Sequence, residues 1–242
     1  MIAVRQENGV HSITLNQPLI GNSLSDGMVA ALHDALDQMA RQDGRLLVLR
    51  GEGRHFCTGF HLGDLESESD GSLLLRFVRI EQLLARIWTA PFPTLAIAQG
   101  CAFGAGADLF VACRRRVAIE GARFRFPGAG FGLVLGTRRL AERVGGDTAC
   151  GWIAGGVTVD APTAVSRGLA TDLASADMID AIMAQEVAAA SRLHPATMAA
   201  ICAASRNETV HADQDLAALV RSAACPGLKD RIAAYLAELS KG

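Results

Sequence analysis

The sequence has few of the features that mark membrane, secreted or nucleic-acid-binding proteins. Its formal net charge over 242 residues is −2, so it lacks the basic field that favours nucleic acid or an anionic membrane surface. No uninterrupted apolar stretch approaches the roughly 20 residues that span a bilayer. The N-terminus has an early Arg5 and Glu7 instead of the basic start and apolar run of a signal peptide. We therefore expect a cytoplasmic protein that binds neither nucleic acid nor membrane.

Cysteine patterns that would indicate a disulfide framework or a zinc site are also missing. The six cysteines include no C-x-x-C pair and no His-rich spacing. We expect them to be buried free thiols in a reducing compartment, and we expect no metal site.

The glycine-rich loops lack the motifs of nucleotide binding and of serine nucleophiles. The G-A-G of residues 104–106 and the G-F-G of residues 130–132 do not extend to G-x-G-x-x-G, because Leu109 and Leu135 occupy the last position. The sequence contains neither G-x-x-x-x-G-K-[ST] nor G-x-S-x-G. These absences leave little support for a nucleotide-binding fold.

Strand and helix patterns alternate in the first part of the chain, and helix patterns dominate the last part. Asn8 and Gly9 lie between two strand-like runs and predict a tight hairpin. Ser25 and Asp160 each precede a helix pattern as N-caps, and a longer helix is expected over residues 73–88. Further helices are expected over residues 175–206 and 211–240. The order indicates an α/β protein with a C-terminal helical segment.

Two glycine-rich loops each follow a predicted strand: FCTGFHL at residues 56–62 and FGAGADL at residues 103–109. Backbone N–H groups that are free at such loops can converge on an anion that develops during a reaction. The alternative is that these glycines serve tight turns and close packing alone.

Longer stretches around both loops resemble the crotonase (enoyl-CoA hydratase/isomerase) superfamily. HFCTGFHLGDL is similar to the family's F-[CS]-[AS]-G-x-D-[LI] loop, and PTLAIAQGCAFGAGADLFVAC to its P-x-I-A-x-[VI]-x-G-x-A-x-G-G-G-x-[ED]-L-x-x-x-C signature. LNQPLIGNSLSDGM and GTRRLAERVGGDTACGWIAGGVTVDAPTAVSRGLATDL extend the likeness on either side. These motifs occur in the family's order and cover most of residues 1–173.

The resemblance implies a crotonase-like spiral of ββα units over residues 1–185, followed by a C-terminal helical oligomerisation region over residues 186–242. It implies a homotrimer, or a hexamer made of two trimers. It also implies an acyl-CoA thioester as substrate, a role in fatty acid metabolism, and no cofactor apart from the coenzyme A that the substrate carries.

The resemblance further implies an oxyanion hole, in which two backbone N–H groups hold the thioester oxygen while an enolate forms. Matched position by position, these N–H groups belong to Phe60 and Ala105. The substrate-binding positions that we expect are Gly59, Gly104, Gly128 and Lys229.

The sequence departs from the family's hydratases at the two positions that activate water. Asp108 matches the first glutamate but is one methylene shorter, and Gly128 occupies the position of the second. Because Gly128 has no proton to give, the acid pair is incomplete and classical hydratase activity is disfavoured. His61, where the family usually has Asp, could act as acid, base or hydrogen-bond donor, or could simply pack. The expected catalytic residues are therefore Asp108 and His61.

Three functions follow. The leading hypothesis is an enoyl-CoA hydratase/isomerase-like enzyme, a lyase or isomerase, that stabilises an enolate and uses Asp108. A decarboxylase of malonyl-type acyl-CoA is the first alternative, because decarboxylation needs the oxyanion hole but no water-activating pair. The second alternative is an acyl-CoA-binding homologue without catalysis.

Overall fold

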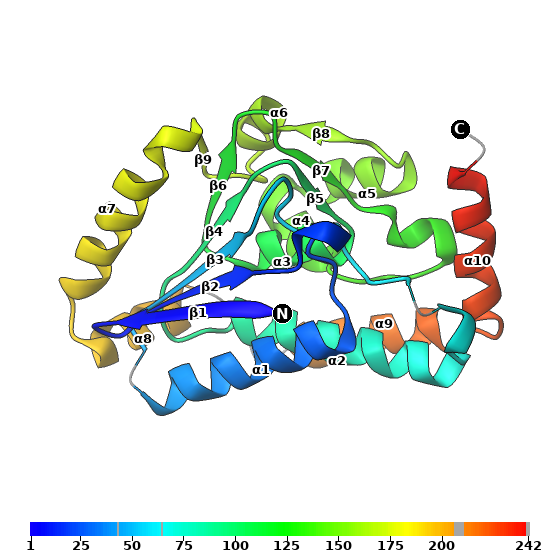
Figure 1. Ribbon diagram of the computed structural model, residues 1–242, viewed down its shortest axis with the longest axis horizontal. Coiled ribbons are helices and arrows are strands. Elements are labelled where there is room, and N and C mark those ends of the chain that lie inside the picture. The colour runs from blue at the N-terminus through cyan, green and yellow to red at the C-terminus, as the bar shows by residue number, and fades with distance from the viewer. Residues whose placement is uncertain (43, 64, 206–210, 241–242) are drawn as a thin grey trace.

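Two β-sheets form the centre of the molecule, with helices around them (Figure 1). The computed structural model describes residues 1–42, 44–63, 65–205 and 211–240. One sheet has the strand order β1-β2-β3-β4-β6-β9, and the other has the order β5-β7-β8. The strands are β1 (Ile2–Glu7), β2 (Val10–Leu15), β3 (Leu46–Gly51), β4 (Thr94–Ala98), β5 (Cys101–Phe103), β6 (Arg115–Ile119), β7 (Arg123–Arg125), β8 (Val159–Asp160) and β9 (Asp172–Ala174).

The pairing follows the predicted alternation of strands and helices. β1 and β2 are antiparallel, whereas the pairs from β2 through β9 in the larger sheet are parallel. Asn8 and Gly9 have φ values of 51° and 80°, so the predicted tight turn between β1 and β2 is confirmed. The parallel pairs need crossover connections, and helices supply several of them. The architecture is the predicted α/β fold.

Two helices begin directly after the capping residues that the sequence predicts. The side chains of Ser25 and Asp160 accept hydrogen bonds from the amides of Met28 and Thr163, which confirms both N-caps. The helix expected at residue 73 begins earlier, because Ser69 and Ser72 form a reciprocal capping box. The helices are α1 (Asp26–Arg41), α2 (Asp70–Trp88), α3 (Ala105–Ala112), α4 (Thr137–Val144), α5 (Gly146–Ala154), α6 (Ala161–Ser166), α7 (Ile179–Ser191), α8 (Pro195–Ala204), α9 (His211–Ala223) and α10 (Leu228–Leu239).

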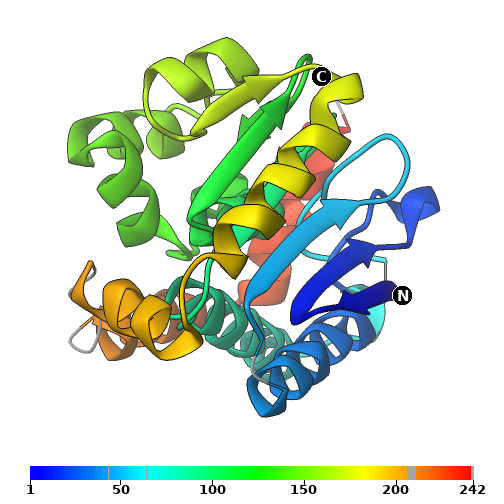
Figure 2. The ribbon, with the colours of Figure 1, turned by 90° about the vertical axis from the view of Figure 1, so that its left-hand side faces the viewer.

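The larger sheet is covered on both faces. The main core contains the apolar side of α1, with Met28, Leu32 and Met39 fully buried, together with α2 and α3. The opposite face packs against α7 through Ile182 and Ala190, and Figure 2 shows α7 crossing the strands. The boundary predicted after residue 185 falls inside α7, so the division into two regions stays a prediction.

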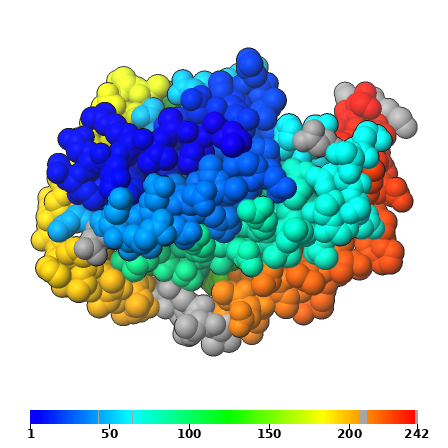
Figure 3. All heavy atoms as spheres, turned by 60° about the horizontal axis from the view of Figure 1, so that its bottom comes forward, coloured from blue at the N-terminus to red at the C-terminus, as the bar shows by residue number. Residues whose placement is uncertain are grey.

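The C-terminal helices α9 and α10 return to the first half of the chain. A buried cluster joins Leu73 and Phe77 of α2 to Leu219 of α9 and Ile232 of α10. Figure 3 shows this face of the molecule, where α2 lies beside α9 and α10. Residues far apart in sequence therefore pack into one buried cluster.

Candidate active site

The two glycine-rich loops lie side by side. The amide of Cys57 donates to the carbonyl of Cys101 over 3.2 Å, and the amide of Phe103 donates to the carbonyl of Cys57 over 3.0 Å. Gly59 has a φ of +100°, and a Cβ there would lie 2.6 Å from the Phe103 oxygen and 3.6 Å from the Ala105 nitrogen. Glycine is therefore required at position 59, both for its backbone conformation and for the close approach of the loops.

The backbone N–H groups of Phe60 and Ala105 lie where the loops meet and have no hydrogen-bond partner among the described residues. Ala105 is the first residue of α3, and the first amides of a helix have no partner within it. Among the described residues, neither the Phe60 amide nor the Ala105 amide donates a hydrogen bond. Both residues line the same cavity. The N-terminal end of α3 adds a partial positive charge at this point.

Phe60 is held by contacts on its side chain. Its ring stacks on the ring of Phe77, with centroids 4.2 Å apart and planes at 21°. The guanidinium carbon of Arg76 lies 4.2 Å from the same ring centroid, and Nη2 of Arg76 donates to the carbonyl of His61 over 3.0 Å. These contacts fix the backbone on the C-terminal side of the free Phe60 amide.

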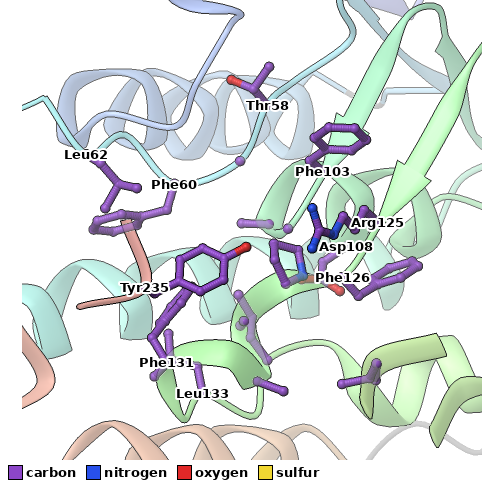
Figure 4. A pocket seen from close by; sticks show the side chains of 18 of the residues that line it. Thr58, Phe60, Leu62, Phe103, Asp108, Arg125, Phe126, Phe131, Leu133 and Tyr235 are labelled. Carbon is purple, nitrogen blue, oxygen red and sulfur yellow. The ribbon is translucent and has the colours of Figure 1, made fainter. Parts of the chain in front are cut away.

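A largely apolar cavity of about 290 Å³ lies beside the two amides. Figure 4 shows side chains that line it. Its polar side chains are Thr58, Asp108, Arg125, Thr137 and Tyr235. Helix α10 closes one side with Tyr235, Leu236 and Leu239. It is anchored by Arg231, whose Nε donates to the carbonyl of Phe131 over 3.0 Å. The remaining lining residues are Gly59, Phe60, Leu62, Phe77, Phe103, Gly104, Ala105, Phe126, Pro127, Gly128, Ala129, Phe131, Leu133, Leu135 and Ile153.

Asp108 is the acidic side chain of this cavity. It is 5% exposed, and its Oδ1 has no hydrogen-bond partner among the described residues. Burial raises the pKa of Asp108 well above its usual value, and Glu81 raises it further, while Arg139 opposes both. The site therefore favours the protonated carboxylic acid, which can donate a proton.

A buried ion pair lies behind Asp108. Nη1 of Arg139 donates to Oε2 of Glu81 over 3.0 Å, and Nη2 of Arg139 lies 3.3 Å from Oδ2 of Asp215. The side chains of Arg139 and Glu81 are 1% and 2% exposed. Burial raises the pKa of Glu81, although the hydrogen bond and charge of Arg139 act to lower it. The pair joins α4 to α2 and contributes to the electrostatic environment of Asp108.

The structure brings most of the predicted site residues together, but not all. Phe60, Ala105 and Asp108 line the cavity, as do Gly59, Gly104 and Gly128. His61 is not part of the lining, and its Nδ1 lies 2.9 Å from the Ser23 Oγ. Lys229 also lies outside it, with Nζ donating to the carbonyl of Glu66 over 2.7 Å.

Four polar lining residues were missed from sequence: Thr58, Arg125, Thr137 and Tyr235. Arg125 lies directly before the Phe126-Pro127-Gly128 segment, which contains the position of the family's second acid. This neighbourhood is a sequence signal that indicates a place near the site. Tyr235 reaches the cavity through the return of α10, where its ring lies 5.3 Å from that of Phe131. No local pattern around Tyr235 indicates that contact.

Known proteins are similar to this chain in both sequence and fold. The model of the enoyl-CoA hydratase/isomerase family matches residues 5–224. A crystal structure from Bordetella parapertussis, assigned to the enoyl-CoA hydratases/isomerases, is 44% identical with a TM-score of 0.95, covering 98% of each chain.

Curated relatives are less similar in sequence than this crystal structure. They also extend beyond the region that matches this chain. "Probable enoyl-CoA hydratase" of Bacillus subtilis is 33% identical over 69% of this chain and 67% of its own length. "Ethylmalonyl-CoA decarboxylase" of Xenopus laevis is 29% identical over 70% of this chain and 58% of its own length. The chain thus matches about two thirds or less of these relatives. It belongs to the enoyl-CoA hydratase/isomerase family, within the crotonase superfamily.

Proposed function

We propose that this protein is an enzyme that acts on an acyl-CoA thioester and stabilises its enolate with the amides of Phe60 and Ala105. Negative charge appears on the thioester oxygen only as the enolate forms, so fixed donors aimed there favour the transition state over the ground state. One such donor typically contributes roughly 2.7–4 kcal/mol. The two free amides at the junction of the loops support this role.

The observation that carries the proposal is the position of Asp108. It follows Ala105 by three residues on α3, so both lie on one side of that helix and both line the cavity. A carbon next to the thioester carbonyl, held by the two amides, would therefore lie near the Asp108 carboxyl group. We assign Asp108 the transfer of a proton to or from that carbon.

Hydration of a double bond is not the reaction that the cavity supports best. The family's hydratases use two acids on one water, and Gly128 occupies the second position. Among the described lining residues, Asp108 is the one acid. Single-acid chemistry through an enolate, as a lyase or isomerase, therefore agrees better with these residues.

A second candidate is decarboxylation of a malonyl-type thioester, which the raised pKa of Asp108 favours. The bond between Cα and the carboxylate breaks, carbon dioxide leaves, and the electron pair forms the enolate. Asp108 then gives its proton to Cα, and water restores that proton. This route needs no second acid, and the similarity to an ethylmalonyl-CoA decarboxylase supports it.

Turnover of a panel of thioesters tests the proposal. Crotonyl-, 3-enoyl-, 3-hydroxyacyl- and malonyl-CoA would be assayed with the wild type and with Asp108→Asn. We expect at least one thioester to react, with the variant slower by roughly 10²-fold or more. Release of carbon dioxide would identify the decarboxylase. Tight binding of an unreactive analogue, with no turnover of any thioester, would instead support the acyl-CoA-binding homologue.

Other parts of the assignment stay predictions. A homotrimer or a hexamer, a cytoplasmic location and a role in fatty acid metabolism follow from the family resemblance. Across the described residues, no helix is long and apolar enough to cross a membrane. Analytical ultracentrifugation of the purified chain would measure its assembly.

A further inference from the structure

Arg125 is a charged side chain in a largely apolar cavity, and it has no ion-pair partner among the described residues. It is the last residue of β7, and its side chain lines the cavity. Its Nε is buried and has no hydrogen-bond partner, and no described carboxylate forms an ion pair with it. A guanidinium group carries a positive charge. Because its Nε is buried, this charge is partly removed from water, and no described carboxylate offsets the cost.

The position of Arg125 places it beside the reacting end of a bound thioester. Its backbone carbonyl accepts a hydrogen bond from the Gly104 amide over 2.8 Å, directly before Ala105. It pairs with Phe103 across the sheet, and Figure 4 shows its side chain beside Phe103 and Phe126. Gly128, where the family's second acid is missing, follows three residues later. This wall of the cavity therefore carries a cation and no acid.

Asp108 does not neutralise Arg125. No ion pair joins the two side chains, and burial raises the pKa of Asp108, which favours the uncharged form of its carboxyl group. An arginine in such a place is suited to an incoming anion, because its planar group gives a carboxylate two parallel hydrogen bonds.

We propose that Arg125 binds a carboxylate carried by the acyl group, so that the preferred substrates are CoA thioesters of dicarboxylic acids. This inference rests on the proposed function, since it requires that the cavity receive the acyl group. The carboxylate could be attached to Cα, as in a malonyl thioester, or lie at the far end of a longer chain. In both cases a carboxylate pairs with the guanidinium group, and analogues of two chain lengths distinguish the two positions.

The phosphates of coenzyme A are the competing anions. The cavity around Arg125 is largely apolar, with phenylalanine, leucine and isoleucine side chains on its walls. Such a lining suits an acyl chain rather than a multiply charged, strongly hydrated phosphate group. Binding of free coenzyme A distinguishes the two anions.

The test is calorimetric binding of unreactive thioether analogues of malonyl-CoA and glutaryl-CoA, each beside a methyl-ended counterpart of equal chain length. Arg125→Gln removes the charge. Arg123→Gln is the matched control, because Arg123 lies on the same strand but is exposed and outside the cavity lining. Arg125→Lys tests whether a cation without the planar fork restores binding in part.

We expect the wild type to prefer a carboxylate-ended analogue, and Arg125→Gln to weaken its binding by roughly 10- to 100-fold. Methyl-ended analogues and free coenzyme A should bind all variants alike, which also shows that the variants are folded. Equal wild-type binding of both series would overturn this inference and leave the proposed function intact. Equal weakening of free coenzyme A by Arg125→Gln would assign the residue to a phosphate instead. Failure of the wild type to bind any analogue would overturn the proposed function as well.

Discussion

The carboxyl group of Asp108 occupies the space that a side chain at Gly136 would need. A Cβ at Gly136 would overlap Oδ1 of Asp108, and Gly136 has a φ of +67°, which L-residues with side chains rarely adopt. Gly136 is the N-cap of α4, the helix that carries Arg139. The start of α4 thus fixes the depth at which the candidate proton-transfer group lies in the cavity.

Replacing Gly136 by alanine should displace the Asp108 carboxyl group. We expect a loss of activity close to that of Asp108→Asn, together with a loss of roughly 1–3 kcal/mol in the free energy of unfolding from backbone strain. Thioester turnover and urea denaturation measure the two effects. Gly151→Ala in α5 is the control, because a Cβ there meets nothing within 4 Å. Full activity in Gly136→Ala would show that the position of Asp108 does not matter.

The raised pKa of Asp108 predicts how stability depends on pH. The unfolded chain loses this proton near about pH 3.9, whereas the folded chain keeps it until its own, higher pKa. Its stabilising contribution is complete below the unfolded pKa and is lost as pH rises through the folded pKa. The slope reaches at most about 1.4 kcal/mol per pH unit.

Asp108→Asn removes that dependence. Urea denaturation of both proteins from pH 4 to pH 8 should show the variant gaining stability relative to the wild type as pH rises. The other buried acid, Glu81, is present in both proteins, so its titration largely cancels in the comparison. Parallel curves would mean that Asp108 titrates near its ordinary value in the folded chain.

A glutamate at Gly128 should supply the missing second acid. Gly128 does not have a left-handed φ, and a Cβ there would lie 3.7 Å from the Leu133 Cβ, an ordinary contact. We expect Gly128→Glu to raise the hydration of crotonyl-CoA by roughly 10²-fold, the scale of general acid–base catalysis. Gly128→Gln keeps the size without the acid and should not gain activity. An equal gain in both variants would refute the single-acid interpretation.

The Arg139–Glu81 pair should matter for folding. Arg139→Met leaves a buried carboxylate without its cation and should cost about 3–5 kcal/mol in the free energy of unfolding. The double variant Glu81→Leu with Arg139→Met should recover much of this loss, since no unpaired charge remains. Arg5→Met is the control, because the Arg5 and Glu7 side chains are 82% and 64% exposed. A loss below about 1 kcal/mol in Arg139→Met would contradict the role of the pair.

Local signals predicted much of the fold. The Asn8-Gly9 turn and the caps at Ser25 and Asp160 depend on residues within a few positions, and each was confirmed. The capping box at Ser69 and Ser72 is equally local but was missed, so α2 begins earlier than expected.

The candidate site depends more on tertiary contacts. Phe60, Ala105 and Asp108 were selected because their motifs resemble those of a family, and the structure gathers them around one cavity. Tyr235 reaches that cavity because α10 packs against the first half of the chain, through contacts more than a hundred residues apart. Spacing along the sequence carries no information on such contacts. His61 shows the converse, because it directly follows Phe60 in the motif, yet its ring makes a hydrogen bond with Ser23 and does not line the cavity.

Exchange of the Cα hydrogens of saturated thioesters in deuterated water tests the central claim most directly. Removing a Cα proton to form the enolate and reprotonating it from solvent replaces hydrogen by deuterium, without requiring the complete natural reaction. Proton NMR of butyryl-CoA and glutaryl-CoA would follow this exchange with the wild type and with Asp108→Asn. The account predicts exchange of at least one thioester by the wild type, slowed by roughly 10²-fold or more in the variant. No exchange of either thioester, or equal exchange by both proteins, would contradict it.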